Sequence, residues 1–263
     1  MLGTRVNFQF CKGAVSFSAP SWGSAAALSL GCETDFAAKS DTFCVLTQNL
    51  IQQLSVSPHA TVGTSYPYAR CDGSIVEKDG KMKALWEEAV LGVRENMKVR
   101  DAAVIEGKES YFTSYLHSKL TANAQASGPG VGKTGALVEM SMIEPSDDRE
   151  KDQSVLEEAG RKLAMHIVAM KPLFLSAKDI PSSMLEEEKG IFLKQIEDEE
   201  AAQGKKPKPQ DIREKIVSGK LNKWSKGIAL LEQEHVASGE ENGGAVKKIL
   251  KASGIRCNGF ILL

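Results

Sequence analysis

The chain has 263 residues, of which 42% are hydrophobic and 25% are charged, and its formal net charge is −1 at pH 7. This length suffices for one large domain or for two subdomains that share a core. The near-neutral charge excludes nucleic-acid binding through overall attraction, so such a role would need a local basic patch. No apolar run approaches the roughly 18 residues that a membrane-spanning helix needs.

The first part of the chain predicts a β-hairpin followed by a helix. Residues 15–19 alternate apolar side chains with serines, the pattern of a half-buried strand, and residues 25–30 form an apolar run after a turn at 20–24. Ser40 or Asp41 is expected to cap the helix. Its apolar residues fall three to four positions apart, on one face: Phe43, Leu46, Leu50 and Leu54.

The middle of the chain predicts turns, a second helix and three strands. Residues 56–80 are rich in turn-forming Pro, Gly and Asp, and residues 81–97 have helical periodicity. The three strands are predicted at residues 98–106, 110–118 and 136–142. The last two flank a glycine-containing loop at 122–134, so we expect them to pair as a hairpin.

The last part of the chain is predicted to be mainly helical. Helices are expected at residues 155–170, 182–203, 211–231 and 246–252, before a final strand at 255–263. A run with three lysines (Lys205, Lys206, Lys208) is typical of a solvated linker and lacks the interleaved aromatic residues of a single-strand binding site. Because the strands come as hairpins, the pattern predicts an α+β fold with antiparallel sheets.

The segment Cys32-Glu33-Thr34-Asp35-Phe36 places a charged residue beside an aromatic ring at the end of a predicted strand. A ring in such a turn has no obvious core to enter, so Phe36 suits a wedge that inserts into a partner. The structural alternative is that Phe36 folds back and caps its own core.

This segment resembles a family signature. Residues 32–39, Cys-Glu-Thr-Asp-Phe-Ala-Ala-Lys, with Asp41 and Phe43 after them, look like the signature of the elongation factor Ts family. Further blocks follow in the order of that family, at residues 94–107, 114–117, 163–172, 216–224 and 258–261. The resemblance covers residues 14 to 263.

The resemblance implies two related subdomains, each a small antiparallel sheet covered by helices. We expect the first at residues 14–109, with the Thr-Asp-Phe motif, and the second at 110–263. Residues 1–13 would be an N-terminal extension or a targeting remnant.

The resemblance also implies a function: guanine-nucleotide exchange on the translational GTPase elongation factor Tu, by protein–protein contact and without enzymatic catalysis. In this scheme Phe36 displaces elements that support the magnesium ion of the nucleotide, and GDP leaves. The residues implied to contact the partner are Thr34, Asp35, Phe36, Ala37, Val93, Arg94 and His117. The alternative is a non-catalytic binding or assembly protein with the same fold.

Several positions depart from the family pattern. Arg94 stands where the family often has glycine, Asp101 where it often has arginine, and Ala37 where valine is more common. The family signature begins at residue 32, so we expect the small helical domain that usually precedes it to be absent, either because the chain is divergent or because the gene model is incomplete. This favours an organellar protein, most simply a mitochondrial one, with the plastid or the bacterial cytoplasm as alternatives.

The run Gly128-Pro129-Gly130-Val131-Gly132-Lys133-Thr134 resembles a phosphate-binding loop but has the wrong spacing. That motif needs four residues between its first glycine and Gly-Lys-Thr, and it must open a helix. Here only three residues intervene and a strand is predicted next, so we expect no nucleotide or other cofactor.

The remaining reactive residues give no catalytic constellation. The five cysteines (Cys11, Cys32, Cys44, Cys71, Cys257) are odd in number and widely spaced, which favours reduced thiols in an intracellular compartment and no metal site. His166 lies among apolar residues and is expected to be a core histidine, and no histidine has a paired nucleophile in the sequence. We therefore expect no catalytic residue, no direct nucleic-acid contact and no membrane contact.

Overall fold

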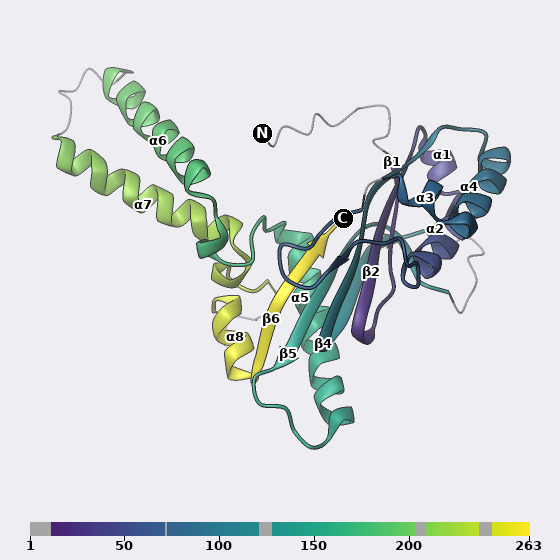
Figure 1. Ribbon diagram of the computed structural model, residues 1–263. Coiled ribbons are helices and arrows are strands. Elements are labelled where there is room, and N and C mark those ends of the chain that lie inside the picture. Colours follow the sequence, from purple (N-terminus) through teal and green to yellow (C-terminus); the bar gives the residue numbers. More distant parts are fainter. Residues whose placement is uncertain (1–11, 72, 121–127, 203–208, 237–243) are drawn as a thin grey trace. The chain divides into compact units, whose positions relative to one another are not determined.

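The structure is a computed structural model that describes residues 12–71, 73–120, 128–202, 209–236 and 244–263 (Figure 1). The chain divides into two compact units. The first comprises residues 1–169 and 252–263, and the second comprises residues 170–251.

The first unit is built on a six-stranded sheet with the order β3-β4-β2-β1-β5-β6. The strands are β1 (Lys12–Phe17), β2 (Ser21–Cys32), β3 (Val62–Gly63), β4 (Met97–Lys119), β5 (Val131–Met142) and β6 (Ile255–Leu262). Neighbouring strands are antiparallel except β3 and β4, which are parallel. The α+β fold class predicted from the sequence is confirmed.

Strand β4 is one strand of 23 residues, where the sequence predicted two strands separated by a break. Its first part pairs with β2, and its second part pairs with β5. The two small sheets expected from the family are thereby joined into one sheet. The predicted boundary at residue 109 lies within β4, and the division of the chain into subdomains there stays a prediction.

Four strands form a closed circuit of pairings. β1 pairs with β2, β2 with β4, β4 with β5, and β5 returns to β1 through Val15↔Gly132 and Ser16↔Val131. The predicted turn at residues 20–24 belongs instead mostly to β2, whose register shifts between Trp22 and Gly23. Buried side chains of these strands, Phe17 and Phe112 among them, pack in one cluster.

Four helices of the first unit pack against a second buried cluster: α1 (Asp35–Ala38), α2 (Asp41–Leu54), α3 (Ile75–Lys78) and α4 (Gly80–Val93). The predicted cap of α2 is confirmed, because the Ser40 hydroxyl accepts a hydrogen bond from the Phe43 amide at 3.3 Å. The predicted apolar face of this helix is also confirmed, since all four of its residues are buried: Phe43, Leu46, Leu50 and Leu54.

Helix α5 (Arg149–Met170) lies against β4 and β5 (Figure 1). A Cβ atom at Gly160 would lie 2.1 Å from both Met140 Cε and Thr113 Cγ2, so glycine allows the close approach. His166 on this helix is buried, as the sequence predicted.

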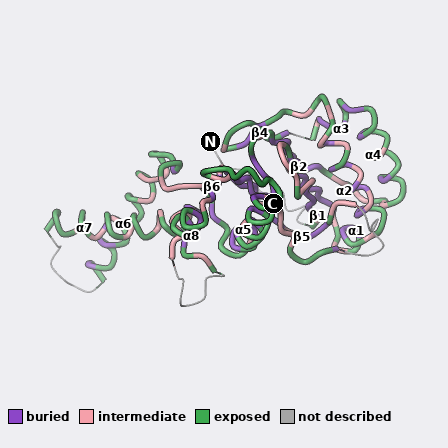
Figure 2. The backbone as a smooth tube through the Cα atoms, turned by 90° about the horizontal axis from the view of Figure 1, so that it is seen from below, coloured by how far each residue is buried: buried purple, intermediate pink, exposed green. Residues whose placement is uncertain are grey.

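The second unit is mainly helical. Its long helices α6 (Ser182–Ala202) and α7 (Gln210–Ile228) contact each other. A 3₁₀ turn at Ala177–Asp179 precedes α6, a second one at Leu230–Glu232 follows α7, and α8 (Val246–Ala252) comes after it. Most residues of α6 and α7 are exposed, as the tube in Figure 2 shows; Ile196, Glu200 and Val217 are the buried ones among those described. Within the described ranges, every helix is too short or too polar to span a bilayer.

Candidate functional site

The ring of Phe36 is 89% exposed, on a helix of only four residues. The next two residues of α1, Ala37 and Ala38, are buried against the cluster beneath the helices. The helix is thus anchored by two methyl groups while its aromatic side chain remains in solvent. The alternative in which Phe36 caps its own core is wrong.

Thr34 begins α1 as its N-cap, with an extended backbone (φ −120°, ψ 157°). Its hydroxyl accepts a hydrogen bond from the Ala37 amide at 3.1 Å and donates one to Glu95 Oε1 at 2.6 Å. Its amide donates to Glu95 Oε2 at 3.0 Å. One carboxylate therefore binds both donors of the residue that starts the helix.

A second hydrogen bond joins the same two segments, and here the donor belongs to the segment that holds Glu95. Asn96, the residue after Glu95, donates through Nδ2 to Oε1 of Glu33, the residue before Thr34, at 2.8 Å. The β2–β4 ladder ends beside them, at Cys32↔Met97. We call Glu33, Thr34, Glu95 and Asn96 the Thr34 clamp; it continues the ladder with side chains where the backbone pairing stops.

Two further contacts surround the clamp. Lys12 Nζ lies 3.4 Å from Asp35 Oδ2, and both side chains are nearly half exposed, so this ion pair contributes little. The Cys32 thiol donates to the Thr34 carbonyl at 3.3 Å. Burial, with the nearby Glu95 carboxylate, raises the pKa of Cys32 to about 11, which keeps the thiol neutral and able to donate.

Val93 and Arg94 lie beside the clamp, at the end of α4. Val93 is the last helical residue and is partly buried against the core, whereas Arg94 is exposed. The sequence predicted that this helix would reach residue 97. It ends earlier because Arg94 has a left-handed backbone (φ 56°, ψ 27°), and the chain then enters β4.

Sequence reasoning missed two features of this region, the contact of Glu95 with Thr34 and the exposure of Leu91. Leu91 is 78% exposed on α4. The signal for Leu91 was present, since it stands two residues after Ala89 and so on the opposite side of the helix. The pairing of Glu95 with Thr34 spans 61 residues and has no local signal.

His117 is exposed near the end of β4, with its Nδ1 atom 3.3 Å from the Tyr115 hydroxyl. The circuit of strands brings this end back toward β1, because Lys119 pairs with Gly132 and Gly132 pairs with Val15. Two strand spacings, about 10 Å, therefore separate this end of β4 from β1. β1 in turn begins beside the clamp, where Lys12 pairs with Cys32.

The glycine run that resembles a phosphate-binding loop enters a strand, as its context predicted. Its residues from Val131 onward belong to β5, and the Gly130 carbonyl accepts a hydrogen bond from the Ser16 hydroxyl at 2.7 Å. No helix follows whose amides could hold a phosphate.

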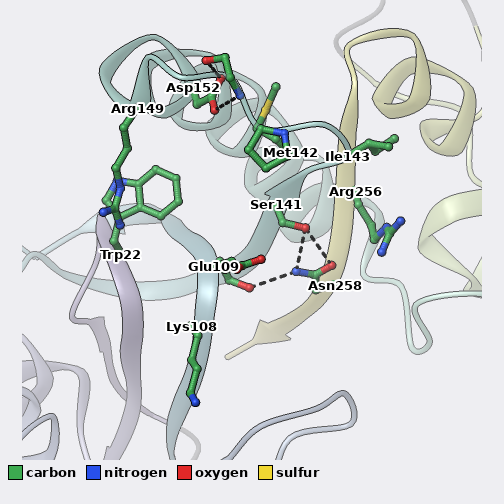
Figure 3. A pocket seen from close by; sticks show the side chains of 13 residues that line it. Trp22, Lys108, Glu109, Ser141, Met142, Ile143, Arg149, Asp152, Arg256 and Asn258 are labelled. Carbon is green, nitrogen blue, oxygen red and sulfur yellow. Dashed lines mark hydrogen bonds between the residues drawn. The ribbon is translucent and has the colours of Figure 1, made fainter.

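A polar cavity of about 700 Å³ lies at the other end of β2 (Figure 3). The Arg149 guanidinium lies 4.5 Å from the centre of the Trp22 ring on its rim, and Asn258 donates to Ser110 and Ser141 across its floor. Trp22 stands ten residues before Cys32, about 33 Å along an extended strand. The cavity is therefore separate from Phe36 and from the Thr34 clamp.

The described cysteines Cys32, Cys44, Cys71 and Cys257 are all free and buried, in agreement with the predicted reduced thiols. Cys11 and the lysines of the predicted linker, Lys205, Lys206 and Lys208, lie outside the described residues. Among the residues that are described, no three His, Cys, Asp or Glu side chains are grouped as a metal site would require.

The structure defines an α+β protein with a sheet covered by helices and an exposed aromatic ring on a short surface helix. The family model described as "Elongation factor TS" matches residues 33–263. The chain belongs to the elongation factor Ts family.

Individual relatives agree with this assignment. The protein named Elongation factor Ts of Agrobacterium fabrum is 30% identical over 246 residues, which cover 91% of this chain and 70% of the relative. The protein of that name from Rhizobium rhizogenes is 30% identical over 235 residues, 88% of this chain and 66% of the relative. The one from Bartonella henselae is 30% identical over 213 residues, which cover 81% of this chain and 61% of the relative. This chain spans about two thirds of the length of these curated relatives.

The mitochondrial location expected from the sequence finds no support in these comparisons. The relatives named above are all bacterial proteins. The expectation rested on where the family signature begins in the chain, and the matching relatives do not favour an organelle.

Proposed function

We propose that this chain is a guanine-nucleotide exchange factor for elongation factor Tu in translation elongation, and that it acts by protein–protein contact. Membership of the elongation factor Ts family supports this proposal. The bacterial relatives make the bacterial cytoplasm the best supported of the three locations considered.

The single observation that carries the proposal is the exposure of Phe36. A phenylalanine that is 89% exposed leaves apolar area available to a partner. Its helix is held at both ends, by the Thr34 clamp before the ring and by Ala37 and Ala38 after it. Such a ring enters a partner pocket with little loss of conformational freedom, because its support is already ordered.

In the proposed mechanism Phe36 inserts into the GTPase domain and displaces elements that support the magnesium ion bound with GDP. Loss of the metal leaves the phosphate charges less well balanced, and GDP dissociates faster. Burying one phenylalanine contributes roughly 1.5–3 kcal/mol, about 10- to 150-fold in an equilibrium constant. Larger accelerations need a second contact, which we propose for Val93, Arg94 and His117.

The experiment is the release of a fluorescent GDP analogue from elongation factor Tu of the same organism. The wild-type chain is expected to accelerate release, and Phe36→Ala is expected to reduce the acceleration by about tenfold or more, from the loss of the buried ring. A matched control is Val56→Ala, which removes an apolar side chain that is 71% exposed in the turn after α2.

The same assay separates the proposal from the non-catalytic binding or assembly role. Binding without acceleration, or equal acceleration by wild type and Phe36→Ala, contradicts the wedge mechanism. Acceleration that Val56→Ala reduces as much as Phe36→Ala would show a general loss of the fold in place of a specific role for the ring.

A further inference from the structure

We infer that Glu95 is a positioning residue for nucleotide exchange: its carboxylate grips Thr34 and thereby fixes the orientation in which α1 presents Phe36. This inference rests on the proposed function and adds a residue that acts on the ring through the N-cap of its helix. The hydrogen bonds of Glu95 go to Thr34, the residue before Asp35 and Phe36.

The geometry assigns a direction to the Thr34 hydroxyl. Its proton points to Glu95 Oε1, at 2.6 Å, so a lone pair is left to accept from the Ala37 amide at 3.1 Å. The second carboxylate oxygen of Glu95 accepts from the Thr34 amide at 3.0 Å. Glu95 therefore holds the capping residue by two atoms and orients the hydroxyl that caps the helix.

Helix α1 depends on such external support. A single turn of four residues is far below the roughly 12 residues at which isolated helices become stable, and its own anchors are the small side chains of Ala37 and Ala38. Without the grip on Thr34, the turn that carries Phe36 would keep its attachment to the core but lose the restraint on its entry angle.

The other contacts around α1 are weaker candidates for this restraint. The Lys12–Asp35 pair is nearly half exposed on both sides and is screened by solvent. The Asn96–Glu33 contact is a single exposed hydrogen bond at 2.8 Å. Glu95, partly buried and with both oxygens bound to one residue, is the member of the clamp whose geometry is most constrained.

The test measures GDP-analogue release as a function of chain concentration, with Glu95→Gln as the main variant. Glutamine has the size of glutamate but replaces one acceptor oxygen with an NH₂ group, so its two terminal atoms cannot both accept hydrogen bonds from the hydroxyl and the amide of Thr34. The maximal release rate is expected to fall about fivefold, a fraction of what two charge-assisted hydrogen bonds can contribute. The concentration at half-maximal rate and the thermal midpoint are expected to change little.

A double-mutant cycle with Phe36→Ala separates positioning from direct contact. If Glu95 acts through the ring, Glu95→Gln causes no further loss in the Phe36→Ala background. Equal loss in both backgrounds, or a raised half-saturating concentration with an unchanged maximal rate, overturns the inference. Thr34→Val, which removes the hydroxyl and keeps the shape, must reproduce the loss of maximal rate.

Glu87→Gln is the matched control, since it removes the same charge from an exposed position on α4. The arms also distinguish the two proposals. If wild type does not accelerate release, the proposed function fails and the inference falls with it. If Phe36→Ala impairs release but Glu95→Gln does not, only the inference fails.

Discussion

Arg94 forms the C-cap of α4 with a left-handed backbone (φ 56°, ψ 27°), and its amide bonds to the Val90 carbonyl at 3.1 Å. Glycine is the residue that usually fills this position, because it carries no Cβ to crowd the carbonyl. The glycine that the resemblance in sequence implies for this position would suit this backbone. An arginine here accepts local strain and adds a positive charge beside the Thr34 clamp.

Replacing Arg94 with glycine is therefore expected to stabilise the protein. Removing the side chain from a residue with a left-handed backbone relieves strain of about 1 kcal/mol. A chain of this size should then have a melting temperature roughly 2–4 °C higher. Thermal unfolding followed by circular dichroism measures the change.

Arg94→Ala is the matched variant, because it removes the guanidinium but keeps the Cβ atom. It should show no comparable gain in the melting temperature. If exchange activity falls equally in both variants, the side chain contacts the partner; if glycine does not stabilise, the strain at Arg94 is relieved elsewhere in the fold.

The sequence located the exposed ring but not the residue that supports it. Thr34, Phe36 and Arg94 were found because they stand in contiguous motifs. Glu95 stands in such a motif too, but its contact with Thr34 appears only when the ends of β2 and β4 meet. A side chain-to-side chain contact across 61 residues leaves no periodicity in the sequence, so pattern reasoning could not find it.

At the scale of the element, Asp79 holds the start of α4. Its Oδ1 atom accepts from the amides of Lys81 and Met82 at 3.0 and 3.1 Å, and its Oδ2 atom accepts from the Ser57 hydroxyl at 2.7 Å. Burial raises the pKa of this carboxyl, but these bonds and one from Gln53 outweigh it and lower the pKa to about 2. The cap thus remains charged and bonded well into acid solution.

Asp79→Ala is expected to lower the free energy of unfolding by about 1–2 kcal/mol at pH 7, through loss of the cap. Because the folded pKa of Asp79 lies below its ordinary value of 3.8, its charge stabilises the fold above about pH 4, and this contribution disappears as the pH falls to about 2. The difference in the free energy of unfolding between wild type and Asp79→Ala should therefore decrease as the pH falls from about 4 to about 2.

Urea denaturation at pH 7, 4 and 2.5 measures this narrowing. Asp79→Asn, which keeps an acceptor oxygen without the charge, should lose less than Asp79→Ala at pH 7. If the difference in unfolding free energy between wild type and Asp79→Ala does not change with pH, the role assigned to the carboxylate is contradicted.

Elements with a local signal were predicted well, and elements shaped by distant contacts were not. The cap and apolar face of α2 were correct because both lie within consecutive turns of one helix. The break expected within residues 98–118 was wrong, since Gly107 and its neighbours remain extended where β4 passes from β2 to β5. A strand that changes partner midway has no distinct signal in a chain read residue by residue.

At the scale of the whole molecule, the proposed exchange function requires that GDP and the chain each weaken the binding of the other to the GTPase. If the chain weakens GDP binding by a given factor, GDP weakens binding of the chain by the same factor, typically 5- to 150-fold for coupled sites. Adding GDP is therefore expected to loosen the complex with elongation factor Tu, and calorimetric titration at several GDP concentrations measures it.

Phe36→Ala supplies the control for this coupling. This variant should reduce both the factor by which the chain weakens GDP binding and the equal factor by which GDP weakens binding of the chain. The reason is that the ring is proposed to contribute part of this coupling. A dissociation constant that is indifferent to GDP contradicts exchange and would favour simple binding.

The closed circuit of strands also affects how the chain folds as it is synthesised. β1, β2 and β4 are complete by residue 119, but the second edge of β1 has no neighbour until residues 131 and 132 have been made. An unpaired strand edge is open to pairing with another chain, and contacts this distant in sequence form slowly. A nascent chain that stalls between β4 and β5 therefore leaves the ribosome-bound intermediate with an aggregation-prone edge, which closes only when the second half of the sheet emerges.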